Sequence, residues 1–243
     1  MRITFLGTGS AMPVPDRVQT GILLADDDRR LLVDVGSGVL NRLAGTDAGY
    51  AGVDTVLLTH HHLDHVADLL PLLKARWLAG EEDLTVVGPN GTVELVDGLL
   101  GVHDYLQDRV DLTVREVGAE SFQVKGFDVD AKETRHSMYC HAYRFDDSVT
   151  YSGDTEAFPG LAEFADGSDV LVHDASFPDE IDVSNHPTPA QLGASLAGMD
   201  IGRVYLSHLY PHTNGKHDEM LDSIREQYDG DVRFARDGLT VDV

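Results

Sequence analysis

The chain has 243 residues, of which 42 are Asp or Glu and 18 are Lys or Arg, so its formal net charge is −24. Hydrophobic residues make up 42% of the chain, a share that excludes intrinsic disorder despite this charge. The lone cysteine excludes an intramolecular disulfide framework and the apolar runs are too short to span a membrane, so we expect a cytoplasmic protein without membrane or disulfide-linked partners.

Apolar runs rich in β-branched residues predict strands, and apolar positions three and four residues apart predict helices. In the first half of the chain the expected strands are Ile3–Leu6, Gly21–Ala25, Leu31–Val35, Val53–Thr59, Leu84–Val87 and Asp111–Val117. The expected helices there are Val39–Ala44, His65–Leu78 and Thr92–Val102. Pro71 falls in the second turn of helix 65–78, which weakens that prediction without removing it.

The second half repeats this order of strands followed by helices. Its expected strands are Phe122–Thr134, His141–Tyr151, Asp169–Val172, Arg203–Ser207 and Val232–Val241, with turns at Gly126, Asp146–Asp147 and Asp237–Gly238. Its expected helices are Glu156–Phe164, Pro189–Leu196 and His217–Tyr228. The repeated order predicts an α/β fold in one domain over residues 1–243, with two similar halves packed as a sandwich.

The acidity is of an unusual kind, because the chain has 31 Asp but only 11 Glu, and 14 Arg but only 4 Lys. The acidic residues are spread along the chain, as in Asp26–Asp28 and Glu81–Asp83. This pattern resembles proteins of extreme halophiles, whose surfaces work in molar salt, where the Debye length is only ~3 Å. The alternative is an ordinary acidic protein, which at low salt would repel nucleic acid.

The sharpest motif is the histidine-rich run at the end of the predicted strand 53–59. His60, His62, Asp64 and His65 fit the pattern H-x-H-x-D-H. A turn between a strand and a helix can direct His60 and His62 to one metal ion, and Asp64 and His65 to a second. A solvated turn with Asp64 as a helix cap would explain the aspartate but not the crowded histidines.

This hexad resembles the signature of the metallo-β-lactamase fold superfamily, and the resemblance extends over nearly the whole chain. The opening Phe5–Ser10, with Pro13 just after it, is similar to the first strand of the phosphodiesterase branch. Asp34, in the run LLVDVGSG, stands where the family keeps a supporting aspartate beside the metals. The resemblance implies a four-layer αββα sandwich with two pseudo-symmetric halves.

The resemblance also implies a full set of seven metal ligands. One Zn²⁺ would bind His60, His62 and His136, a second would bind Asp64, His65 and His208, and Asp154 would bridge the two. Mn²⁺ and iron are alternative metals. Taken alone, His136 is typical of a loop, Asp154 of a turn or helix cap and His208 of a core, but all seven residues stand in the family's order.

Two positions separate this chain from other branches of the superfamily. B1-type β-lactamases use a cysteine ligand and lack the bridging carboxylate, whereas here Asp154 occupies the bridging position and Cys140 is not placed to replace it. His62 stands at the third position of the hexad instead of a glutamate, which disfavours the flavo-diiron branch.

A second pair of motifs favours the ribonuclease Z-like phosphodiesterases. The run His173–Ser176, read HDAS, and the later His186 are similar to the HEAT and HST motifs of that branch. The resemblance implies that Asp174 orients His186, which protonates the leaving oxygen. Asp replaces Glu and Pro187 replaces Ser, so a water or a shifted His186 could be needed to complete the pair. The alternative is a strand-end acid and a solvated loop histidine.

Ribonuclease Z grips tRNA with a long arm between its third histidine ligand and the bridging aspartate. In this chain residues 137–153 fill that interval, and one strand hairpin uses them all. No Gly-rich or Lys-rich arm stands elsewhere in the sequence. The chain is therefore more similar to the small, armless phosphodiesterases.

The resulting hypothesis is a dinuclear zinc phosphodiesterase in which a metal-bridging hydroxide attacks a small phosphodiester, such as a cyclic nucleotide. Asp64, Asp174 and His186 are the candidate catalytic residues, Asp64 also being a ligand. One alternative is 3′-tRNA processing on an RNA substrate. Another is thioester or other ester hydrolysis of the glyoxalase II kind, which is disfavoured because this chain lacks the basic C-terminal segment that such enzymes use. A non-catalytic metal-binding module is a further alternative, although such members usually lose ligands. Related enzymes are commonly dimers, which makes a homodimer one possibility, and the sequence leaves the oligomeric state open.

Overall fold

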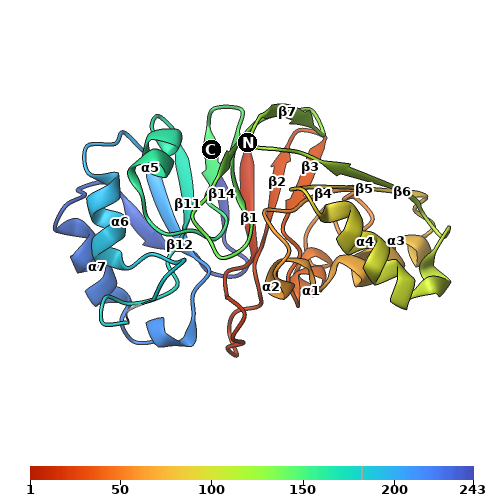
Figure 1. Cartoon of the computed structure of the whole chain (residues 1–243), viewed down its shortest axis with the longest axis horizontal. Coiled ribbons are helices and arrows are strands. Elements are labelled where there is room, and N and C mark those ends of the chain that lie inside the picture. Colours follow the sequence, from red (N-terminus) through yellow and green to blue (C-terminus); the bar gives the residue numbers. More distant parts are fainter. Residues whose placement is uncertain (182) are drawn as a thin grey trace.

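The structure is a computed structural model that describes residues 1–181 and 183–243. Two β-sheets pack face to face and helices cover the outer face of each, which gives four layers (Figure 1). Helices α1–α4 lie over one sheet and α5–α7 over the other. The predicted α/β class and αββα architecture are confirmed.

The two sheets are built alike. The first has the order β14-β1-β2-β3-β4-β5-β6, and the second has the order β13-β12-β11-β10-β9-β8-β7. In the first, the pairs from β14 to β3 are antiparallel and those from β3 to β6 are parallel. In the second, the pairs from β7 to β10 are antiparallel and those from β10 to β13 are parallel. This shared pattern is the expected pseudo-symmetry of the halves.

The strands of the first sheet are β1 (Arg2–Gly7), β2 (Gly21–Asp26), β3 (Arg29–Val33), β4 (Thr55–Leu57), β5 (Asp83–Gly88), β6 (Asp111–Glu116) and β14 (Thr240–Asp242). Those of the second are β7 (Ser121–Val124), β8 (Phe127–Glu133), β9 (His141–Phe145), β10 (Val149–Tyr151), β11 (Val170–Asp174), β12 (Arg203–Ser207) and β13 (Val232–Phe234). The α-helices are α1 (Val39–Leu43), α2 (Leu63–Val66), α3 (Leu69–Ala79), α4 (Thr92–Val102), α5 (Pro159–Ala165), α6 (Pro189–Leu196) and α7 (His217–Arg225). Two short 3₁₀ turns span Asp104–Leu106 and Pro211–Thr213, and no helix in the described ranges has the length and apolarity that crossing a membrane requires.

The main core lies between the sheets. Side chains of a strand alternate between its two faces, so Leu24 of β2 enters this core while Leu23 packs under the helices. The rings of Phe5 on β1 and Tyr205 on β12 have centroids 5.3 Å apart, which joins the two sheets directly. The rigid double sheet holds the loops at its edge in fixed positions.

The prediction of one helix over His65–Leu78 is wrong, because α2 and α3 are separate helices with Asp68 at the break. The Asp68 carboxylate accepts hydrogen bonds from the backbone N–H groups of Gly38 and Leu40 at the start of α1, at 2.8 and 3.0 Å. Pro71 is the third residue of α3, where a missing N–H costs no helical hydrogen bond. The break turns α2 toward the site described below.

Two further boundaries differ from the predictions. The expected closing strand Val232–Val241 is two strands in different sheets, so the segment around Asp237–Gly238 crosses between sheets instead of forming a hairpin. Helix α5 starts at Pro159, not at Glu156, whose backbone N–H donates to the Arg135 carbonyl. Proline at the first helical position sets this later start.

Candidate metal centre

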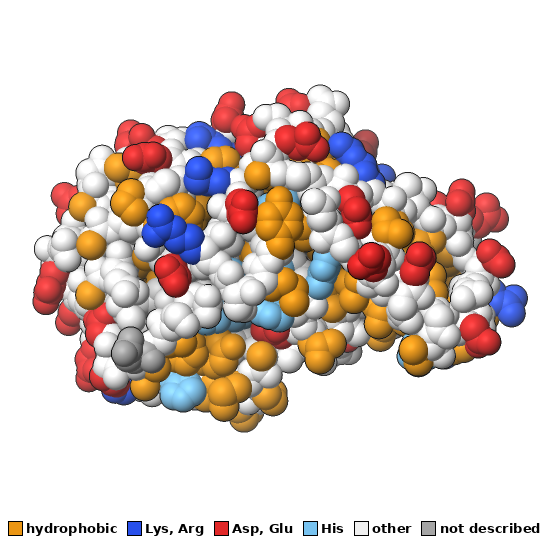
Figure 2. Space-filling model, viewed as in Figure 1, with side chains coloured by type: hydrophobic (Ala, Val, Ile, Leu, Met, Phe, Trp, Pro, Cys, Tyr) orange, Lys and Arg blue, Asp and Glu red, His pale blue; other side chains and the backbone are white. Residues whose placement is uncertain are grey.

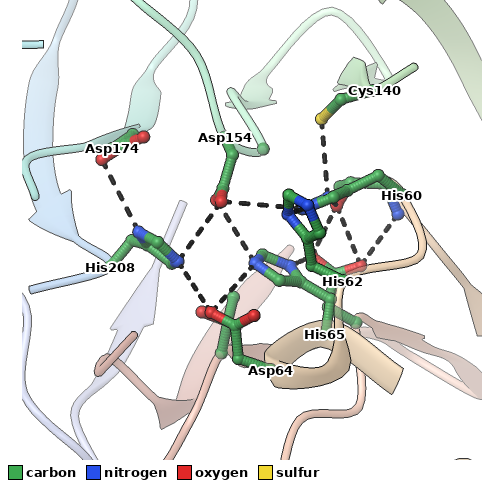
Figure 3. Close-up of polar contacts among 12 residues, drawn as sticks. His60, His62, Asp64, His65, Cys140, Asp154, Asp174 and His208 are labelled. Carbon is green, nitrogen blue, oxygen red and sulfur yellow. Dashed lines mark hydrogen bonds and ion pairs between the residues drawn. The ribbon is translucent and has the colours of Figure 1, made fainter. Parts of the chain in front are cut away.

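Strand ends bring the predicted site residues together at one edge of the sandwich. His60 follows β4, Asp154 follows β10 and His208 follows β12, each strand being part of a parallel set. Adjacent parallel strands end at the same edge, so the loops that leave them converge. Figure 3 shows the resulting group of imidazoles and carboxylates.

One group consists of His60, His62, His136 and Asp154, whose nearest donor atoms all lie within 4.8 Å of one another. Nδ1 of His62 lies 3.0 Å from Nε2 of His60 and 3.1 Å from Nε2 of His136. Oδ2 of Asp154 lies 3.7 Å from Nε2 of His60 and 3.8 Å from Nε2 of His136. Three imidazoles and a carboxylate form a donor set that suits Zn²⁺.

A second group consists of Asp64, His65 and His208. Nε2 of His208 lies 3.2 Å from Oδ2 of Asp64, and Nε2 of His65 lies 3.8 Å from the same oxygen. Asp154 reaches this group too, with Oδ1 3.3 Å from Nε2 of His65 and Oδ2 3.4 Å from Nε2 of His208. The Asp154 carboxylate therefore lies between the two groups (Figure 3).

Buried nitrogen atoms in these groups fit a metal ion. Nε2 of His65 is buried and has no hydrogen-bond partner among the described residues, although the ring's other nitrogen is bonded. A buried polar atom without a partner is costly, and a lone pair aimed at a metal removes that cost. The donors around it are imidazole and carboxylate, which Zn²⁺, Mn²⁺ and iron accept.

Asp34 is hydrogen-bonded to several residues at this edge of the sandwich. Its carboxylate accepts hydrogen bonds from the backbone N–H of Thr59 at 2.8 Å, from Nδ1 of His65 at 2.8 Å and from the hydroxyl of Tyr151 at 3.3 Å. The bond from Nδ1 leaves Nε2 of His65 as the ring nitrogen that faces the cluster. Asp34 thus lies beside the ligand groups and not among them, as expected from the resemblance.

Burial and charge act against each other in the cluster. Burial lowers the pKa of His60 well below its usual value, and the neighbouring His65 lowers it further. Burial also opposes the charged form of His65, but the carboxylates of Asp154 and Asp34 outweigh it and raise the pKa of His65 to about 10. Burial likewise opposes ionisation of Asp154, yet His208 and His65 hold its pKa well below the usual range. The site is therefore strongly polarised, with an ionised carboxylate at its centre.

Asp174 and His186 meet beside the two groups. Oδ2 of Asp174 lies 2.7 Å from Nδ1 of His186, so the shorter acid reaches the histidine without a bridging water. The backbone N–H groups of Thr155 and Ser176 also donate to this buried carboxylate, at 3.2 and 3.0 Å. Burial lowers the pKa of His186, but the Asp174 carboxylate outweighs burial and raises it.

His186 lies close enough to the cluster to belong to it geometrically. Its ring centroid is 5.2 Å from that of His136 and 5.5 Å from that of His208. Donor atoms of Asp154, Asp174, His186 and His208 also lie within 4.8 Å of one another. Distance alone therefore allows His186 to act either as a proton donor or as a ligand.

Two residues near the hexad stay outside both groups. Nε2 of His61 lies 2.8 Å from Oγ1 of Thr92 at the start of α4, and His61 belongs to neither donor group. Sγ of the buried Cys140 lies 3.6 Å from Nδ1 of His60, the ring nitrogen that does not face His62. Cys140 therefore contacts the candidate ligand His60 on the side away from the other donors, and it does not take the position of a ligand.

Two residues important to the geometry were not identified from the sequence. Ser176 lies between Asp174 and His208, and its only signal is its place in the HDAS run. Gly36 lies against the hexad, where a Cβ atom would come within 2.0 Å of the carbonyl oxygen of Asp64. Only glycine permits this approach, and its signal is the Gly-Ser-Gly run after Asp34.

A family model described as Anti-Pycsar protein Apyc1 matches residues 1–219 of the chain. The chain belongs to this family. Like the family model, individual relatives match almost the whole length of this Apyc1-family chain. The ribonuclease Z of Mycobacterium marinum is 30% identical to it, over 100% of this chain and 99% of the relative.

Solved structures have the same fold. The metallo-β-lactamase fold protein YhfI from Bacillus subtilis superposes with a TM-score of 0.88 at 24% identity, covering 99% of this chain and 98% of YhfI. The short form of human tRNase Z superposes with a TM-score of 0.78 at 20% identity, covering 100% of this chain and 99% of that chain. The Apyc1-family chain is therefore a ribonuclease Z-like metallohydrolase of the metallo-β-lactamase fold, and a metal-dependent phosphodiesterase or nuclease.

Proposed function

We propose that this chain is a dinuclear zinc phosphodiesterase that hydrolyses a small phosphodiester, with a cyclic nucleotide as the first candidate. The observation that carries the proposal is the position of Asp154, whose carboxylate lies within 3.3–3.8 Å of imidazole nitrogens from both donor groups. A carboxylate placed between two donor groups can bind a metal ion on each side, which suits a two-metal site.

The proposed ligands follow the two groups. One zinc ion would be held by His60, His62 and His136 and the other by Asp64, His65 and His208, with Asp154 shared. When bound, the two ions supply positive charge to the phosphate and acidify water. Mn²⁺ or iron would fit the same donors.

The chain's own side chains would orient the reactants and deliver a proton. Nδ1 of His186 is bonded to Asp174, so the proton available to a leaving oxygen is the one on Nε2. Asp174 holds the ring and favours its protonated form, which is what a general acid needs. Asp64, next to Asp154 and His208, would also orient the attacking water.

The short segment between His136 and Asp154 supports a small substrate. It contains β9, β10 and the tight turn between them, so no arm extends from this interval. The alignment with the mycobacterial ribonuclease Z runs over 275 positions, whereas this chain has 243 residues, so the relative has residues without a counterpart here. The same similarity keeps 3′-tRNA processing as the second candidate function.

The decisive experiment is purification in molar KCl, a measurement of zinc per chain, and turnover of a chromogenic bis-aryl phosphodiester with and without a chelator. We expect two zinc ions per chain and chelator-sensitive turnover. Asp154→Asn should lower both, while Asp147→Asn, on the exposed β9–β10 turn, should change neither. Fewer than one zinc ion per chain after reconstitution, or the same turnover rate with and without the chelator, would refute the proposal.

The substrate class is tested next with a cyclic nucleotide and a precursor tRNA. We expect turnover of the cyclic nucleotide and little cleavage of the RNA. Efficient cleavage at the tRNA 3′ end would favour the ribonuclease Z function instead.

We also propose that the enzyme works in a salt-rich cytoplasm. The support is the distribution of its acidic side chains, which lie scattered over the visible surface and gather in no single patch (Figure 2). Repulsion within such a coat is screened at molar ionic strength. Activity should therefore be higher in molar KCl than in dilute buffer, and the reverse order would contradict this proposal.

We further propose a homodimer formed through the face that carries α1 and α3. Leu78, in α3, is 67% exposed there, which is unusual for leucine. A surface groove of about 580 Å³ lies beside Leu78, lined mainly by Leu40, Ala44, Tyr50, Ala75 and Ala79. Sedimentation in molar KCl should give twice the chain mass, and Leu78→Glu should give a monomer. Val102→Glu, at a valine that is 78% exposed, should leave the mass unchanged.

A further inference from the structure

Ser176 occupies the space between the proton-donating pair and the second ligand group. It is the second residue after the end of β11, and the backbone N–H of the residue before it donates to the carbonyl of Ser207, the residue before His208. Its side chain is fully buried, and Oγ lies 2.6 Å from Oδ1 of Asp174 and 2.9 Å from Nδ1 of His208. One hydroxyl group therefore contacts both parts of the site.

The single hydrogen of this hydroxyl determines how the bonds run. A serine hydroxyl donates once and accepts through its lone pairs. The bond to Oδ1 of Asp174, at 2.6 Å, is the shortest available, while the carbonyl of His208 lies 3.2 Å away. With the hydrogen given to Asp174, the oxygen must accept a hydrogen from Nδ1 of His208.

When His208 is neutral, this bond selects the tautomer that a metal ion needs. A proton on Nδ1 leaves the lone pair on Nε2, and Nε2 is the atom that lies 3.2 Å from Asp64 and 3.4 Å from Asp154. Oδ1 of Asp174 is 3.7 Å from Nδ1 of His208, beyond hydrogen-bond distance, so the hydroxyl of Ser176 supplies the closer partner for this nitrogen.

The same hydroxyl also fixes the acid that holds His186. Oδ1 of Asp174 accepts from both the side chain and the backbone N–H of Ser176, which leaves Oδ2 turned to Nδ1 of His186 at 2.7 Å. Nδ1 of His186 itself lies 3.2 Å from the serine oxygen. Three side chains thus depend on one buried oxygen.

We propose that Ser176 is a positioning residue that couples the proton donor to the second metal site, by holding Nε2 of His208 toward the metal and Oδ2 of Asp174 toward His186. This inference rests on the proposed function. Its consequence is that loss of one hydroxyl should weaken metal binding and proton delivery together, although Ser176 reaches neither metal nor substrate.

The test compares Ser176→Ala, Ser176→Thr and Ser176→Val, with Ser168→Ala as control. Ser168 is equally buried, but its hydroxyl pairs with Thr150, away from the site. Zinc affinity is measured by competition with a chromophoric chelator, and kcat with a cyclic nucleotide. Ser176→Ala and Ser176→Val should bind one of the two zinc ions about 10–100-fold more weakly, while Ser176→Thr, which keeps the hydroxyl, should bind both normally.

Thr and Val have nearly the same shape, so a fold defect would affect both variants, whereas loss of the hydroxyl affects Val alone.

A mutant cycle gives a second readout: at saturating zinc, adding Ser176→Ala to His186→Ala should lower kcat little further, because both act on one proton transfer. Wild-type zinc affinity in both Ala and Val variants, or equal weakening in Thr and Val, would overturn the inference. If the wild type binds two zinc ions but hydrolyses no phosphodiester, the proposed function fails and the affinity pattern still decides the role of Ser176.

Discussion

His186 shows how one side chain acquires its properties from its neighbours. Burial alone would keep the imidazole neutral, but Asp174 at 2.7 Å reverses that effect and raises the pKa of His186. Asp174 in turn stays ionised although it is buried, because His186 and its hydrogen-bond donors outweigh the cost of burial. The pair is therefore charged in advance of the reaction.

His186→Ala should lower kcat for a cyclic nucleotide by about 10²–10⁴-fold while leaving zinc per chain unchanged. The loss should be much smaller for a bis-aryl substrate, whose phenolate leaves without a proton. His103→Ala, an exposed histidine at the end of α4, is the matched control. Loss of zinc in His186→Ala would instead identify His186 as a ligand, which its distance to the cluster allows.

His141 is a buried histidine outside the metal cluster. Nε2 has no hydrogen-bond partner among the described residues, and burial lowers the pKa of His141 to about 4. In the unfolded chain its pKa is near 6.5, so only the unfolded state binds the proton between these values. The contribution of His141 to stability is therefore present above pH 6.5 and is lost as pH falls toward 4.

His141→Phe should flatten part of this pH dependence, by about 3 kcal/mol at most. Urea unfolding of both proteins in molar KCl at pH 7 and pH 4.5 measures the difference. Parallel losses of unfolding free energy in the two proteins would show that His141 does not titrate as its burial implies.

The sequence was informative about residues whose signal is local. The seven expected ligand residues stand in short motifs at strand ends, and their donor atoms converge in space. Ser176 could not be assigned a role, because its contact with His208 joins residues that are 32 positions apart. The pairing of Asp174 with His186 was implied by the resemblance, but whether the shorter acid would reach His186 directly could not be predicted, because it depends on where the loop after β11 returns.

At the scale of elements, the most informative error is the single helix expected over 65–78. Its apolar spacing continues through the break, so periodicity alone could not show that Asp68 pairs with backbone groups of α1. The same limitation applies to β13 and β14, whose residues look like one hairpin but pair with different partners. Helix α6 has the predicted bounds, and in the structure Thr188 and Gln191 form a capping box at its start.

Arg76 links helix α3 to the first sheet, although its guanidinium is almost wholly buried. It donates to the carbonyl oxygens of Tyr50, Ala51, Val53 and Asp83 at 2.7–3.1 Å. Arg76→Leu would leave these buried oxygens without donors, so we expect a loss of unfolding free energy on the order of 3 kcal/mol. Thermal or urea unfolding measures it, with Arg109→Leu, on the exposed surface, as the control; equal stabilities would contradict the role of Arg76.

At the scale of the whole molecule, charge and packing act in opposite directions. The core between the sheets draws on both halves of the chain, from Ile3 to Val241, which supports the proposal of one domain over residues 1–243. The surface carries the formal charge of −24, which opposes compaction unless salt screens it. The repeated order of strands and helices was enough to predict the fold class. Which strands pair within each sheet depends on contacts between residues far apart in the sequence, and this could not be predicted.

We therefore expect a single unfolding transition whose midpoint rises from dilute buffer to molar KCl. Calorimetry at several KCl concentrations, with sucrose as an uncharged control, measures both properties. Two separate transitions would argue against one domain, and a midpoint that falls with KCl would argue against a salt-adapted surface.

The pairing of β14 with β1 has a consequence for synthesis on the ribosome. Residues 240–242 complete a sheet whose other strands emerge much earlier, so the edge of β1 stays open until β14 has been made. Open strand edges invite pairing with other chains. Nascent chains should therefore be most vulnerable to aggregation after β6 has been made and before β14 emerges, while the first sheet still lacks its last strand.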